Sequence, residues 1–364
     1  MFDEVIEKIL GAIDEKEILT ETYPKFSGEG YRAHKIDIKN FHKIEKTISN
    51  KKIAFIDGGN AEIIGSANFS LNIIRTCYVI YQNNRKIAAK RLEVLAFVKA
   101  VSKNDEIYFK TTFFNLNNNL KFDEISFNSL DHTLMFGINR AEINNVVNAI
   151  RRFAELKLAK YVSDNNFCDI IVLDGNLQCT LTNEKSYFDD LYNSCEKNNI
   201  ILTALSKTNS LFTESGNLLS AILSGISSMD SWFYYPIADI ENSSHKAEMF
   251  FVKFHEKSKH VFRFEIFNMS ANRKAISEHA QKSKIFDIQK TKAEQAINKI
   301  SSNCTDPIFI GYPYGLVEAD RIARVSNNEK ESLKTMLLVK LKNKSIEKYL
   351  SAVNAHEILD KISF

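Results

Sequence analysis

The sequence contains little proline and has no long apolar run. Its 364 residues include 4 Pro, and no stretch rich in glycine and serine marks a flexible linker. No segment approaches the roughly 18 consecutive apolar residues of a membrane span, which excludes a transmembrane helix. Asp3, Glu4 and Glu7 interrupt the apolar residues of the first segment, which therefore does not resemble a secretory signal. We expect one large domain or two, with any second domain inserted into the first.

The cysteines are too few and too scattered for a zinc site or a disulfide framework. The chain has 5 Cys and no C-x-x-C pair, which predicts reduced, mostly buried thiols in a cytoplasmic protein. A formal net charge of +3 excludes a strongly basic nucleic-acid coat but permits a local basic channel. The absence of G-x-x-x-x-G-K-[ST] excludes a P-loop motor within this chain.

Two short apolar runs each end in Asp-Gly. They are Ile53–Ile56 before Asp57, and Ile170–Leu173 before Asp174. Unalternating runs are typical of central strands covered on both faces, and ligands bind outside the strand ends of open α/β sheets. One Asp-Gly alone indicates only a turn. Because the motif is repeated, we predict two carboxylates side by side over one sheet, as a divalent metal requires.

The remaining patterns predict a mixed α/β protein. Helical spacing is found at 2–13, 141–162 and near 185–196. Strands are expected at 53–57, 69–81, 106–114, 170–174, 200–203, 231–240, 249–255, 260–267 and 308–310. The strand at 69–81 should return antiparallel to the first, and the last two segments before 270 should form a hairpin. This order favours an α/β core with a mixed sheet over a doubly wound parallel sheet.

The same patterns suggest the domain organisation. We expect an N-terminal helical segment at 1–50 and a core formed by 51–210 and 300–345. A β-rich insertion is expected at 210–290, and C-terminal helices at 346–364. The apolar face of the first helix should pack on the body of the protein, with contact to a partner as the alternative.

Glu155 is a candidate for the site because its helix directly precedes the Asp174 strand. It borders the apolar stripe of the helix at 141–162, which could aim its carboxylate along the sheet edge. The alternative is an exposed glutamate paired with Arg151 or Arg152 one turn earlier, which is worth only tenths of a kcal/mol.

Asp320 is a second candidate on a helix. Pro313 stands near the first turn of that helix, where its missing N–H costs nothing. Asp320 falls within the stripe of Leu316 and Ala319, so we expect it to be buried and therefore paired, hydrogen-bonded or metal-bound. Glu318 falls on another face and is the weaker candidate.

Four carboxylates from two strands and two helices make a hard, oxygen-only site suited to Mg²⁺ or Mn²⁺. Two carboxylates about 4 Å apart repel by roughly 4 kcal/mol at an effective dielectric near 20. Two cations about 3.5–4 Å apart would relieve that repulsion and clamp both reacting oxygens of a phosphodiester. The predicted catalytic and metal-binding residues are Asp57, Glu155, Asp174 and Asp320.

This order of motifs resembles the NurA nucleases of archaeal and some bacterial DNA-end processing. Strand-Asp-Gly, helix-Glu, strand-Asp-Gly and a closing Tyr-Pro helix follow in the same sequence. Shorter matches are Ser206-Lys207-Thr208 and Phe251-Val252-Lys253-Phe254-His255 with Val261-Phe262-Arg263. The most specific match is Gly311-Tyr312-Pro313-Tyr314, continued by Leu316 and Glu318-Ala319-Asp320. The resemblance covers about residues 50 to 330.

The resemblance implies a ribonuclease-H-like core with flanking helices and a metal-dependent deoxyribonuclease. Such an enzyme acts as an exonuclease on DNA ends and an endonuclease on single strands during double-strand-break repair. The resemblance also implies a homodimer that encloses a channel, and a HerA-type hexameric ATPase as partner. Cleavage polarity, strand preference and the choice between Mn²⁺ and Mg²⁺ stay open.

Site residues carry over by position. Asp57, Glu155 and Asp174 match the metal-binding acids of the family, and Tyr312 matches its tyrosine. Asp320 stands where the family often has histidine. The predicted DNA-binding residues are Lys207, Arg263 and Tyr312, with lysine acting on phosphate as a point charge and arginine as a fork.

The main alternative is a catalytically inactive DNA-binding or adaptor subunit of the same assembly, which the aspartate at 320 would favour. A sugar-kinase or actin-like ATPase needs a Ser- or Thr-bearing phosphate loop and a later glycine cluster. The segment after Asp57 and the absence of such a cluster fit that class poorly. Haloacid-type phosphatases need Asp-x-Asp, which neither Asp-Gly motif provides.

Overall fold

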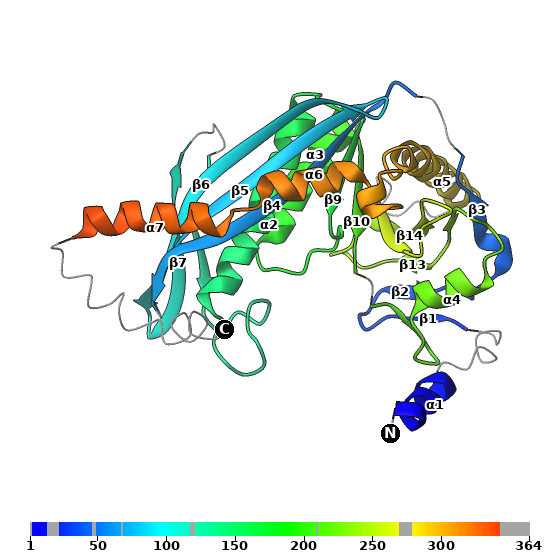
Figure 1. Cartoon of the computed structure of the whole chain (residues 1–364), viewed down its shortest axis with the longest axis horizontal. Coiled ribbons are helices and arrows are strands. Elements are labelled where there is room, and N and C mark those ends of the chain that lie inside the picture. Colours follow the sequence, from blue (N-terminus) through cyan, green and yellow to red (C-terminus); the bar gives the residue numbers. More distant parts are fainter. Residues whose placement is uncertain are drawn as a thin grey trace. The chain divides into compact units, whose positions relative to one another are not determined.

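A computed structural model of the chain describes residues 2–12, 22–45, 49–66, 68–116, 121–208, 210–268 and 279–342 (Figure 1). The chain divides into two compact units, each discontinuous in sequence. Unit 1 comprises 1–51, 172–178 and 201–314, and unit 2 comprises 52–171, 179–200 and 315–364. The predicted helices at 346–364 lie outside the described residues.

Unit 2 is built on long antiparallel strands that follow one another in the sheet in chain order. These are β4 (Lys52–Ser66), β5 (Phe69–Gln82), β6 (Arg85–Lys103), β7 (Glu106–Asn115) and β8 (Ile125–Asn128). Asn83-Asn84 and Asn104-Asp105 join successive strands at positive φ. Asn and Asp tolerate this backbone, which matches the twist of a hairpin.

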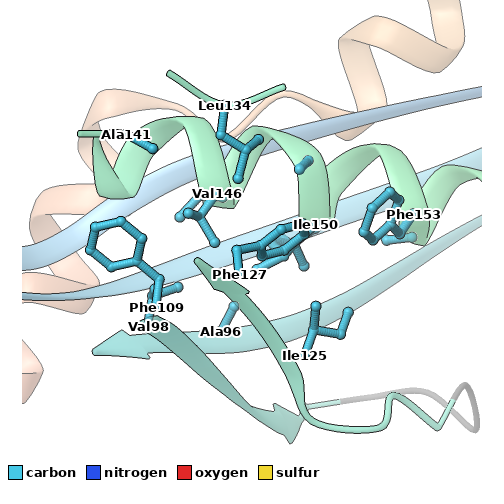
Figure 2. Packing of buried hydrophobic residues seen from close by; sticks show 14 of the residues in the cluster. Ala96, Val98, Phe109, Ile125, Phe127, Leu134, Ala141, Val146, Ile150 and Phe153 are labelled. Atoms are coloured by element: carbon cyan, nitrogen blue, oxygen red, sulfur yellow. The ribbon is translucent and has the colours of Figure 1, made fainter. Parts of the chain in front are cut away.

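Helices cover both faces of the unit 2 strands. On one face lies α2 (Ile143–Asp164), which α3 (Glu184–Lys197) accompanies. Figure 2 shows Val146, Ile150 and Phe153 of α2 packed against Ala96, Val98, Phe109, Ile125 and Phe127 of the strands. On the other face lie α6 (Tyr314–Ala323) and α7 (Asn327–Leu341), and Leu333 and Leu337 of α7 pack against Ile73.

In unit 1 the strands follow one another in the order β3, β12, β14, β15, β10 and β9. Their bounds are Phe41–Lys43, Trp232–Tyr234, Ala247–Lys253, Phe262–Phe267, Ile201–Ser206 and Ile170–Asp174, with 172–174 of β9 in this unit. Two small pairs join β1 (Pro24–Lys25) to β11 (Phe212–Thr213) and β2 (Tyr31–Ala33) to β13 (Ala238–Ile240). The helices of unit 1 are α1 (Phe2–Ala12), α4 (Leu219–Ile226) and α5 (His279–Ser301), with single 3-10 turns at Ile38–Asn40 and Pro307–Phe309.

The mixed α/β class with flanking helices is confirmed, and most predicted elements are present. The hairpin of β14 and β15 is also confirmed. The strand predicted at 308–310 is wrong, because Pro307–Phe309 forms a 3-10 turn capped by Asp306. The first helix is present, but the apolar residues Phe2, Val5 and Ile6 of its described side chains are exposed rather than packed. None of the described helices is long and apolar enough to cross a bilayer.

Candidate active site

Asp57 lies in the middle of a strand rather than at its end. β4 continues for nine residues beyond it, to Ser66, so the strand end predicted at Asp57 is wrong. The carboxylate is buried, with 5% of the residue exposed, and its Oδ1 accepts a hydrogen bond from the Gly58 amide at 2.7 Å. A buried carboxylate needs hydrogen bonds or a cation to stay charged, which makes Asp57 a strong candidate ligand.

Gly58 gives Glu155 of α2 access to this strand. A Cβ at Gly58 would stand 2.7 Å from Glu155 Oε1, which is closer than real Cβ atoms approach. Glycine in a strand often marks such a close approach. Glu155 is itself buried, with 5% exposed, so the expectation of an exposed surface glutamate is excluded.

Two arginines hold the Glu155 carboxylate. Arg151 donates to Oε1 at 2.5 Å and to the Gly58 carbonyl at 3.1 Å, while Arg152 lies 3.6 Å from Oε2. Arg152 also donates to the buried Glu184 at 3.1 Å, and Glu184 accepts from the amides of Thr180 and Leu181. The pairing of Glu155 with the preceding arginines is therefore confirmed. Sequence reasoning missed the role of Glu184, and only its place at the start of a helix could have suggested it.

Asp57 and Glu155 approach β4 from opposite faces. Side chains alternate along a strand, so Asp57 shares its face with Phe55 and Gly59. That face meets α6, because a Cβ at Gly315 would overlap Phe55 and one at Gly59 would stand 2.6 Å from the Ala323 carbonyl. Gly58 and Glu155 belong to the α2 face.

On the α6 face, several carboxylates surround Cys77, the cross-strand partner of Asp57. Burial raises the pKa of the Cys77 thiol to about 12, and the negative charges of Asp57, Glu318 and Asp320 add to the effect. The thiol donates to the Ala319 carbonyl at 3.0 Å. This cysteine therefore fills a protonated, structural position beneath the acids.

The predicted burial of Asp320 is wrong. Its side chain is 40% exposed and pairs with Arg324 one turn later at 2.8 Å. Glu318, judged the weaker candidate, is the buried acid, bonded to Lys86 at 2.6 Å and to the Tyr81 hydroxyl. α6 is rotated so that its small residues Gly315 and Ala319 meet the strands, which brings Glu318 over Tyr81. The role of Asp320 in the site stays a prediction.

Asp174 belongs to unit 1 and lies at the end of β9, so the predicted strand and its end are both confirmed. Gly175 has a φ of 103°, a conformation that favours glycine. Lys207, directly after β10, donates to Asp174 Oδ2 at 2.7 Å, and its Nζ lies 5.6 Å from the centre of the Tyr312 ring. Tyr312 is 1% exposed and stacks on Phe309 at 4.9 Å, so its ring supports Lys207 from within the protein.

The described residues do not bring three metal-ligating side chains of the type His, Cys, Asp or Glu into one cluster. Of the predicted ligands, Asp57, Glu155 and Asp320 belong to unit 2 and Asp174 belongs to unit 1. The predicted DNA-binding residues Lys207, Arg263 and Tyr312 all belong to unit 1.

Comparison with known families defines the class of protein. A NurA domain model matches residues 51–325, which is well over half of the chain. The protein is therefore a nuclease by class, and the chain belongs to the NurA family, as its motifs predict.

Other comparisons are more distant. No curated protein matches the chain. Among solved structures it is similar to Ciona intestinalis endonuclease V in complex with a 24mer DNA containing an inosine followed by a ribo-adenosine, at 12% identity and a TM-score of 0.34, over 79% of this chain and 87% of that one. It is also similar to the catalytic domain of human endonuclease V, at 10% identity and a TM-score of 0.32, over 79% and 85%.

Proposed function

We propose that this chain is a divalent-metal-dependent deoxyribonuclease that hydrolyses phosphodiesters at DNA ends and in single strands. The observation that supports it most is that two acids of the matched family region, Asp57 and Glu155, are both buried against β4, one on each face. Buried ionisable side chains are uncommon and gather at functional sites.

The donor set fits hard cations. Carboxylate oxygens are the ligands that Mg²⁺ and Mn²⁺ prefer, and Asp57, Glu155, Asp174 and Asp320 would hold them. The bound cations, two by family implication, would supply charge neutralisation and activation of the attacking water. In this structure the Glu155 carboxylate is paired with Arg151 and Arg152.

The cationic and aromatic residues of unit 1 suit the DNA backbone. Lys207 is half-exposed and held by Asp174 and the Tyr312 ring, so its ammonium is presented in a fixed place. A phosphate oxygen near Lys207 would compete with Asp174 for the lysine ammonium group. The Asp174 carboxylate would then be available to bind a metal. Three residues form the proposed DNA contact. The charged groups of Lys207 and Arg263 would contact the DNA directly, and Tyr312 would act through Lys207.

Degradation of linear DNA by the purified protein tests the proposal. In Mn²⁺ or Mg²⁺ the wild type should shorten linear duplexes and cut single strands, and EDTA should stop both reactions. Asp57→Asn should be inactive yet folded. If no form of DNA is cut with either metal, alone or with the ATPase, the proposal fails.

An adaptor subunit is the second candidate, since Glu155 is paired with arginines and Asp320 is exposed. Metal binding separates the two functions. If four acids bind Mn²⁺, the free energy of unfolding should rise with metal concentration as RT ln(1 + [Mn²⁺]/Kd), and the melting temperature should rise with it. The adaptor would be favoured if Mn²⁺ did not raise the melting temperature, or if it raised that of Asp174→Asn as much as that of the wild type.

The partners are part of the same proposal. We propose a cytoplasmic homodimer that takes part in double-strand-break resection with a HerA-type hexameric ATPase. The exposed Phe2, Val5 and Ile6 of α1 are compatible with contact to another chain. Light scattering of the purified protein and co-elution with the ATPase test these assignments.

A further inference from the structure

Unit 1 contains a pocket of about 420 Å³ that shares only Arg263 with the residues of the proposed function. Its volume lies within the roughly 300–1,000 Å³ of small-molecule sites. The residues that matter for its chemistry are Lys25, Phe26, Gly28, Tyr31, Met249 and Arg263. All of them belong to unit 1, so the pocket is a property of this unit alone.

One side of the pocket is aromatic. Phe26 and Tyr31 stack with ring centres 4.7 Å apart and planes 3° from parallel. The buried Met249 adds an apolar surface, and thioether sulfur suits contact with aromatic rings. A planar aromatic ligand fits such a wall, because nucleobases stack on aromatic side chains whatever their identity.

Arg263 gives the pocket a positive charge in a fixed orientation. Its Nε donates to Glu265 Oε1 at 2.6 Å, and Nη2 contacts the same oxygen. Glu265 therefore takes one edge of the guanidinium, and the Nη1–Nη2 edge points away from it. That edge can hold two phosphate oxygens at once, which is the geometry that distinguishes arginine from lysine.

A buried network fixes Glu265. Its Oε2 accepts from the Leu177 amide at 2.7 Å and lies 3.1 Å from His245 Nε2. His245 Nδ1 lies 2.9 Å from the Tyr31 hydroxyl. The contacts thus link the aromatic wall to the arginine through His245 and Glu265, so the two parts of the pocket are held at a set separation.

We propose that this pocket binds one deoxynucleotide, with its base against the Phe26–Tyr31 wall and its phosphate on Arg263. Lys25 adds a second cation at the rim. The inference rests on the proposed function only in taking DNA as the source of the nucleotide. Binding itself needs neither metal nor the carboxylates Asp57 and Asp174.

Gly28 offers a way to fill the pocket without breaking any hydrogen bond of the network. A Cβ there would lie 3.5 Å from Tyr31 Cε2, an ordinary contact, and its φ lies outside the positive range. Gly28→Leu should therefore fold while its side chain occupies the place of the base. Gly225→Leu, at a position of α4 with open space around it, is the matched control.

The test is calorimetric titration of the full chain with each deoxynucleoside 5′-monophosphate in EDTA, which prevents hydrolysis. The wild type and Asp57→Asn should bind equally, whereas Gly28→Leu and Arg263→Lys should bind at least tenfold more weakly. Deoxyribose 5-phosphate, which has no base, should also bind at least tenfold more weakly. Gly225→Leu should bind like the wild type.

Three results would overturn the inference: no nucleotide binding, equal binding by Gly28→Leu and Gly225→Leu, or equal binding of deoxyribose 5-phosphate. The last result would reduce the pocket to an anion site. Nucleotide binding by a wild type that cuts no DNA would leave the pocket standing and reject the proposed function instead.

Discussion

The Glu155 carboxylate occupies the space that a side chain at Gly58 would fill. Oε1 would stand only 2.7 Å, and Cγ only 2.9 Å, from a Cβ at that position. Arg151 closes the arrangement by contacting both Glu155 and the Gly58 carbonyl. The position of this acid thus depends on a single missing methyl group beside Asp57.

Gly58→Ala should therefore displace Glu155. We expect cleavage to fall at least tenfold and stability to fall by about 1–3 kcal/mol, the usual cost of overpacking. Cleavage rates and urea unfolding measure the two effects. Gly225→Ala, which meets nothing within 4 Å inside a helix, should leave cleavage unchanged. If Gly58→Ala cut DNA like Gly225→Ala, the position of Glu155 would not matter for the reaction.

Arg75 should be the most costly charged residue to remove from unit 2. It is 2% exposed, and it donates to Glu93 at 2.7 Å, to Glu329 at 3.2 Å and to the Arg324 carbonyl at 2.8 Å. Arg75→Ala removes a buried guanidinium and takes this partner from the largely covered Glu93, which should cost about 3–5 kcal/mol. Glu329→Gln, at a half-exposed partner, should cost less than about 1 kcal/mol. Equal losses in urea unfolding would contradict this.

The stability of unit 1 should depend on pH through Glu248. Burial raises the pKa of its carboxyl to about 7, which hydrogen bonds from Tyr235 and Asn268 only partly oppose. The unfolded chain releases this proton near the ordinary pKa of 4.5. The folded state thus binds more protons between these values, and stability falls as pH rises through this window.

The loss should be of the order of 3 kcal/mol and should be complete above pH 7, since each unit of pKa is worth about 1.4 kcal/mol. Glu248→Gln keeps the side-chain shape but cannot ionise, so it should remove most of this dependence. Urea unfolding at pH 5 and pH 8 measures it, with the exposed Glu256→Gln as control. An unchanged pH dependence in Glu248→Gln would contradict the assignment.

Lys207 should contribute one phosphate contact. Lys207→Gln should weaken DNA binding across all sequences and lower the slope of log K against log salt by about one. Fluorescence anisotropy at several salt concentrations measures the slope. Lys185→Gln on α3, where the lysine pairs with Asp189 on an exposed surface, should leave it unchanged. A slope unaltered by Lys207→Gln would exclude the contact.

Local patterns predicted the central elements well, because buried apolar runs and helical stripes are direct consequences of the core. They missed β6, a strand of 19 residues. Its sequence is rich in Ala, Lys, Arg and Leu, which favour helices. It forms a strand because β5 and β7 hydrogen-bond to it on both sides, and no local pattern shows such partners.

The local geometry around the candidate acids was only partly predictable from the sequence. Asp57-Gly58 indicated the end of a strand, yet β4 continues because β5 pairs with it through Gly58 and Gly59 as far as Ser66. Glu318 is buried and Asp320 is partly exposed, which is the reverse of the expectation. The reason is that Tyr81 and Lys86, more than 200 residues earlier, contact the helix at Glu318. The face that a short helix buries is therefore decided by such distant contacts and not by the apolar stripe of the helix itself.

The proposed function requires both Asp57 and Asp174 for metal-dependent cleavage of DNA. The most direct measurement is the rate at which end-labelled linear DNA is shortened in Mn²⁺ by Asp57→Asn, Asp174→Asn and the double variant. Each single variant should reduce the rate at least a thousandfold, and the double variant should be no slower, since residues that act as a unit are not additive. Asp105→Asn, an exposed acid in a hairpin turn, should cut like the wild type. The proposal would be contradicted if either single variant cut like Asp105→Asn. It would also be contradicted if the fold-loss of rate in the double variant equalled the product of the two single fold-losses.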